Sequence, residues 1–150
     1  MPLAIKTMLH LQKANEAIEQ GKREDALQHL NALDEAFAIE SAGATPAERT
    51  MMLAASAGLY ARAGELEVAV MKFEDVCRHA ERCDPNTTET AGDYSSLAEV
   101  LERLGRLSEA LKAWDASARH LQGAGVWDRY RAGYEKRSDD LRRRLAAESG

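Results

Sequence analysis

The sequence is poor in aromatic residues and in proline. Its 150 residues include two Phe, two Trp and four Tyr, so a core must be built mainly from Ala, Leu and Val. Hydrophobic residues still make up 45% of the chain, which is too many for an intrinsically disordered protein. The three prolines lie outside the interiors of the periodic segments, where they interrupt no helix. This composition predicts closely packed helices.

Long apolar runs and paired cysteines are also missing. No run of about 18 apolar residues occurs, so no membrane-spanning helix is expected, and the first residues lack the apolar stretch of a secretory signal. Cys77 and Cys83 stand six residues apart, where a helix points them to different faces and a disulfide is unfavourable. We therefore expect a cytoplasmic protein that does not bind a membrane.

The charge is mainly negative. Residues 1–124 carry 13 Lys/Arg against 20 Asp/Glu, whereas residues 125–150 carry seven against five. Nucleic-acid binding draws most of its affinity from neutralising phosphates, so an acidic body argues against a nucleic-acid partner.

An internal repeat dominates the sequence. Three segments align without gaps, each with Gly first and Ala sixth: Gly21–Leu27, Gly64–Val70 and Gly105–Leu111. A large apolar residue stands four positions after each of these Ala residues: Leu30, Phe73 and Trp114. The pattern is typical of a helix hairpin, because Gly accepts a left-handed C-cap and Ala lets two helices approach closely.

The helix before each Gly carries a second pattern. Its members are Leu53, Ser56, Ala57 and Tyr60 in the second unit and Tyr94, Leu97, Ala98 and Leu101 in the third. Together with the Ala-x₃-large pattern, they resemble the tetratricopeptide repeat, a 34-residue helix pair. Ser56 departs from the usual Leu and Leu101 from the usual Tyr, and the first unit matches poorly. The spacing of 43 and 41 residues resembles the long-period repeats of kinesin light chains and bacterial peptide sensors.

Capping signals set the expected boundaries. Thr45, Pro46 and Glu48 form a capping-box sequence, and Asp84-Pro85 restarts the chain before the third pair. We expect helices near 3–19, 23–39, 46–62, 66–82, 87–103, 107–121 and 126–146. The resemblance implies an all-α solenoid with a right-handed superhelix. The repeats, about 3–40, 46–83 and 87–122, and a closing helix at 126–146 would then form one domain, 1–150.

The last expected helix has an apolar stripe with a polar residue, Ser138, in its gap. The stripe consists of Trp127, Tyr130, Tyr134, Leu141 and Leu145. Two interpretations remain: the helix covers the open flank of the third hairpin, which we favour, or it is an exposed docking element. Exposure of Trp127 and Tyr134, or of Met51 and Met52, would allow a weak homodimer in place of a monomer.

No residue pattern predicts catalysis or a cofactor. Cys77, His79 and Cys83 form the one dense cluster of metal-binding residue types, but they lack Cys-x₂-Cys spacing and do not converge on one helix face. Adjacent carboxylates such as Asp139 and Asp140 diverge on a helix, and no phosphate loop or nucleophile motif occurs. We expect no enzyme activity, no bound metal and no cofactor.

The resemblance implies that the first helix of each pair lines a concave binding groove. The repeat offsets assign to this groove Met8, Leu11, Asn15, Ile18, Met51, Ala54, Ala55, Gly58, Ala61, Arg62, Ser95, Glu99, Glu102 and Arg103. The small residues of the middle helix either admit a ligand closely or only permit tight curvature. The carboxylate clamp of chaperone-tail-binding members is not expected, because Leu11 stands at its Lys position and Glu99 at an Asn position.

The resemblance implies two functions. The first is a non-catalytic adaptor, scaffold or chaperone-like module that holds a peptide or helix of another protein in the groove. The alternative is a sensory or regulatory protein whose groove accepts a short peptide or small ligand. A solenoid that serves only as an enzyme's accessory subunit is a third class.

Overall fold

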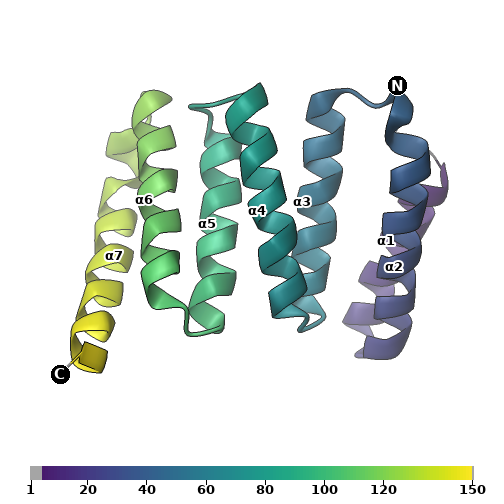
Figure 1. Cartoon of the computed structure of the whole chain (residues 1–150), viewed down its shortest axis with the longest axis horizontal. Helices are drawn as coiled ribbons and strands as arrows, with labels where there is room; N and C mark the ends of the chain where they lie inside the picture. The colour runs from purple at the N-terminus through teal and green to yellow at the C-terminus, as the bar shows by residue number, and fades with distance from the viewer. Residues whose placement is uncertain (1–4, 150) are drawn as a thin grey trace. The chain divides into compact units, whose positions relative to one another are not determined.

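A computed structural model of the chain describes residues 5–149, and the described residues are helical throughout apart from short connections (Figure 1). The elements are α1 (Ile5–Glu19), α2 (Arg23–Glu40), the 3₁₀ turn η1 (Ser41–Gly43), α3 (Pro46–Arg62), α4 (Leu66–Cys83), α5 (Thr88–Arg103), α6 (Leu107–Gly123) and α7 (Trp127–Ser149). The expected all-α class is confirmed, and the described helix ends agree with the sequence to within three residues. Residues 3 and 4 of the first expected helix lie outside the described part.

The chain divides into two compact units, Met1–Lys72 and Phe73–Gly150, with the boundary inside α4. Each unit is described by itself. The expected single domain and right-handed superhelix therefore stay predictions.

Four turns between helices have the same backbone geometry. Gly21, Gly64, Gly105 and Gly125 have positive φ angles of 71°, 88°, 75° and 77°. In each turn the residue after Gly donates its N–H to the carbonyl five positions earlier, as Lys22 does to Ala17 at 2.8 Å. This is a Schellman cap, which favours Gly because side chains strain at positive φ. Three of these caps were predicted, and the fourth joins α6 to α7.

The starts of α3 and α5 use side-chain caps. Thr45 Oγ1 accepts the Glu48 N–H at 3.2 Å, and the Glu48 carboxylate accepts the Thr45 N–H at 2.9 Å. The predicted capping box is confirmed. At α5 the N-cap is Thr87, three residues beyond the predicted restart at Asp84, because Asn86 turns the chain with a φ of 61°.

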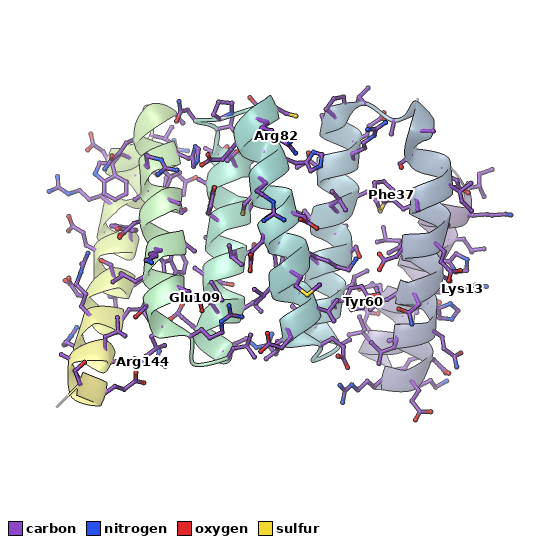
Figure 2. The ribbon with its side chains drawn as sticks, in the orientation of Figure 1. Lys13, Phe37, Tyr60, Arg82, Glu109 and Arg144 are labelled. Atoms are coloured by element: carbon purple, nitrogen blue, oxygen red, sulfur yellow. The ribbon has the colours of Figure 1, made fainter. Side chains whose placement is uncertain are left out.

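The repeat alanines lie in the cores. None of the three has any exposed surface: Ala26, Ala69 and Ala110. In the first unit α1 packs on α2, and α3 contacts both. Figure 2 labels Tyr60 on α3; its hydroxyl donates to Asp34 of α2 at 2.9 Å, and Lys72 approaches the same carboxylate at 2.8 Å.

In the second unit α6 lies beside both α5 and α7 (Figure 1). Leu141 of α7 is fully buried, and Ser138 fills the gap in the stripe with 1% of its surface exposed. α7 therefore packs against α6 of the third hairpin through this part of the stripe, and its role as a cap stays a prediction. Tyr130 remains 41% exposed, so the N-terminal part of the stripe is open to solvent.

Candidate functional site

A groove between α1 and α3 occupies the first unit. It encloses about 400 Å³ and is lined by Met8, Leu11, Gln12, Asn15, Ala55 and Leu59. Met8, Leu11, Asn15 and Ala55 were predicted to face the groove, and the structure brings these four together. The predicted Arg62 reaches it as well, since its guanidinium donates to Asn15 Oδ1 at 2.5 Å.

The other predicted residues of α1 and α3 do not line this groove. Ile18 is half-buried, and Met51 is 64% exposed. Ala54 and Gly58 are partly exposed and Ala61 is 7% exposed, and the floor that these three were predicted to form does not line this groove. The physical reason is the helix period: Ala54, Gly58 and Ala61 lie about 100° around α3 from the row of Ala55, Leu59 and Arg62.

A second groove occupies the second unit, and three helices form it. Its residues enclose about 450 Å³: Thr88, Ala91, Gly92 and Ser95 of α5, Trp114, Ser117 and Leu121 of α6, and Tyr130, Gly133, Tyr134 and Arg137 of α7. A further hollow of about 740 Å³ shares Gly133 and Arg137 with it and continues along Glu102, Lys136, Asp140, Arg143 and Arg144. The two hollows adjoin at these residues and are together called the groove along α7, with an aromatic part and a charged part.

Most polar side chains of the aromatic part already have hydrogen-bond partners. Ser117 donates to the Ala91 carbonyl at 2.8 Å, and Ser95 donates to the Gly92 carbonyl at 2.9 Å. The Tyr134 hydroxyl donates to Asp115, and burial together with this bond raises the pKa of Tyr134 to about 12. The side chain is therefore neutral at physiological pH. Apart from Arg137, which it shares with the charged part, this part presents an uncharged, mainly apolar surface.

Glu102 organises the charged part. Its carboxylate accepts the indole N–H of Trp114 at 3.0 Å and lies 3.4 Å from Arg137 and 3.8 Å from Arg144. The Arg137 guanidinium also lies 5.1 Å from the centre of the Trp114 ring, within cation–π range. One carboxylate thus connects α5, α6 and α7.

Of the four α5 residues that were predicted to face a groove, two line this groove and two do not. Ser95 lines the aromatic part and Glu102 the charged part. Glu99 stands beside the groove, 3.7 Å from Arg137, and the exposed Arg103 does not line it.

Sequence analysis missed the contribution of α6 and α7 to this groove. The missed residues on these two helices are Trp114, Ser117, Leu121, Tyr130, Gly133, Tyr134, Lys136, Arg137, Asp140, Arg143 and Arg144. The sequence favoured a covering role for α7, with an exposed docking element as the alternative. Gly125, which repeats the turn that ends α1, α3 and α5, was the signal that α7 occupies the place of another first helix.

A buried polar cluster joins α4 to α6 away from the groove. His120 is 3% exposed. Its Nδ1 accepts the Asn86 N–H at 3.0 Å. The ring proton is therefore on Nε2, which donates to the Glu81 carboxylate at 2.8 Å. Tyr94 donates to the same oxygen at 2.9 Å. The bonds from His120 and Tyr94 hold the pKa of Glu81 below its ordinary value. Every member has a partner, so the cluster fixes the connection between helices.

The remaining candidates for chemistry are separate from one another. Burial raises the pKa of the Cys77 thiol to about 12, which leaves it protonated and unreactive. Within residues 5–149 no group of three or more His, Cys, Asp or Glu side chains is placed to hold a metal ion.

None of the described helices is long and apolar enough to cross a membrane. Comparison with known proteins adds no family: no family model and no curated protein matches the sequence.

Proposed function

We propose that this protein is a non-catalytic interaction module that holds a short segment of a partner protein in the groove formed by α5, α6 and α7. The observation that carries the proposal is the aromatic part of that groove, an open hollow of about 450 Å³ whose Ser95, Trp114, Ser117 and Tyr134 side chains already have hydrogen-bond partners. Such a surface gains from covering by an apolar side chain, and these paired groups need no new partner when it is covered.

The length of the groove favours a peptide. Its lining on α7 runs from Tyr130 to Arg144, which at 1.5 Å per residue is roughly 20 Å. That length accommodates about six residues of extended chain. The nucleophile candidates are occupied, because the Ser95 and Ser117 hydroxyls donate to backbone carbonyls, and no His lines the hollow. These features support binding without catalysis.

The cellular setting belongs to the same proposal. Cys77 and Cys83 are free thiols, which fits a reducing compartment such as the cytoplasm. The protein would act there as an adaptor or scaffold, as a monomer or a weak homodimer, in line with the resemblance of its repeats to tetratricopeptide arrays.

The test is a selection of twelve-residue peptides displayed on phage, followed by affinity measurements on wild type and two variants. A Cβ at Gly133 meets no atom within 4 Å, so Gly133→Leu introduces an apolar side chain at the groove with open space at its Cβ. Gly58→Leu is the matched control, since Gly58 of α3 is equally open and lies outside this groove.

Selected peptides should bind Gly133→Leu at least about tenfold more weakly than wild type, the loss of one buried apolar contact, and bind Gly58→Leu unchanged. Melting curves check that both variants are folded. Failure to enrich any peptide, or equal binding to Gly133→Leu, contradicts the proposal. Loss of binding in Gly58→Leu alone would move the site to α3.

A further inference from the structure

The charged part of the groove specifies the ligand further. Four cationic side chains line it, Lys136, Arg137, Arg143 and Arg144, against two carboxylates, Glu102 and Asp140. This excess of positive charge is local, because the chain as a whole carries a net charge of −5.

Most of these charges are already paired. Arg143 lies 2.7 Å from Asp140, and Arg137 and Arg144 share Glu102. Two further carboxylates stand nearby and are also engaged, Glu99 with Arg137 and Asp139 with Arg142, each at 3.7 Å. Lys136 makes no ion pair with any residue in the described range 5–149, and its ammonium group is exposed.

We propose that the bound segment carries an apolar side chain for the aromatic part and, beside it, an acidic side chain that pairs with Lys136. This rests on the proposed function. The apolar side chain lies against Trp114 and Tyr130, whose polar neighbours offer it no hydrogen bond. The carboxylate supplies the negative charge that the charged part lacks. A free phosphate group would satisfy Lys136 but leave the aromatic part uncovered.

The spacing between the two side chains follows from α7. The aromatic part is centred near Gly133, and Lys136 follows three residues later, which at 1.5 Å per residue is a rise of roughly 5 Å along the helix. An extended ligand spans this distance in one to two residues, and a helical one in about three.

The experiment uses the selected phage peptides described above. The strongest binder is synthesised with its acidic residue as Glu, as Gln and as Lys, and each form is titrated against wild type, Lys136→Glu and Lys112→Glu. Lys112 is exposed on α6 and lies outside the groove, so it controls for a change of net charge. Melting curves establish that the variants are folded.

With wild type, Glu→Gln should weaken binding about fivefold, the effect of one exposed ion pair, and Glu→Lys should weaken it further. With Lys136→Glu the ranking should reverse, so that the Lys form of the peptide binds most tightly and the Glu form most weakly. With Lys112→Glu the wild-type ranking should be unchanged. If the Glu and Gln forms bind wild type equally while Gly133→Leu still abolishes binding, the acidic requirement is wrong and the proposed function stands. If no peptide binds the groove, both are wrong.

Discussion

The indole N–H of Trp114 on α6 donates to the Glu102 carboxylate of α5 over 3.0 Å, and Glu102 also faces two arginines of α7. The Glu102 side chain is 16% exposed. This contact connects the repeat Ala-x₃-large residue with the wall of the groove. It makes the packing of the third hairpin and the shape of the site depend on the same side chain.

Glu102→Ala should lower the free energy of unfolding by about 2 kcal/mol, because it leaves the Trp114 N–H without its acceptor and Arg144 without its ion-pair partner, while Arg137 keeps Glu99. Glu102→Gln should cost less, since the amide oxygen still accepts. Glu99→Ala is the control: its side chain is 55% exposed and 3.7 Å from Arg137, so a loss below about 0.5 kcal/mol is expected. Urea denaturation measures all three, and equal losses at both positions would contradict this role for Glu102.

His79 and His120 stand ten residues after the repeat alanines Ala69 and Ala110, but the structure gives them different surroundings. His120 is buried and bonded at both ring nitrogens, whereas His79 is partly exposed. His120→Leu should lower the free energy of unfolding by about 2 kcal/mol, because the Asn86 N–H loses its acceptor. His79→Leu should change it by less than about 0.5 kcal/mol. Thermal or urea unfolding of both variants decides, and a small effect at His120 would show that its bonds are dispensable.

The stripe of small residues on α3 gives a pair of matched substitutions. Ala61 is 7% exposed and Ala54 is partly exposed. Ala61→Gln should destabilise the protein by about 1–3 kcal/mol through overpacking, and Ala54→Gln by less than about 0.5 kcal/mol. Melting temperatures of the two variants compare the positions directly. Tolerance of Gln at Ala61 would restore it as a groove position.

Asp93 on α5 should make stability depend on pH. Burial, with a smaller effect of Glu89, raises its pKa from 3.8 to about 6. Folding therefore favours the protonated acid, so this stabilisation is complete below about pH 4 and is lost as the pH rises through about 6.

Asp93→Asn should accordingly raise the free energy of unfolding at pH 8 by on the order of 2 kcal/mol and change it little at pH 4. Urea denaturation across this range provides the measurement. Asp139→Asn, at an exposed position of α7, should show no such rise at pH 8. If the effect of Asp93→Asn is constant with pH, the charge of Asp93 is not its cause.

The helices and their ends could be predicted from the sequence because their causes are local. A Gly that ends a helix needs only its own positive φ, and the Thr45–Glu48 box needs only four residues. The repeat placed Ala26, Ala69 and Ala110 in the core correctly, since close helix packing requires a small side chain wherever it occurs. The groove of α1 could also be partly predicted, as the period of one helix sets which residues share a face.

Only the tertiary structure decided the second groove. Gly92 on α5 and Gly133 on α7 are 41 residues apart in the chain, and they line the same hollow because α6 lies beside both helices. The periodicity of α7 shows an apolar stripe but does not state which part is covered; Leu141 is buried and Tyr130 is open. The sequence does not decide the exposure of Ala61 either, because its small side chain fits an exposed groove floor and a packed helix contact equally. Local sequence determines where each helix begins and ends and which residues share a face. The exposure of a residue depends instead on the neighbouring helices that the fold packs against that face.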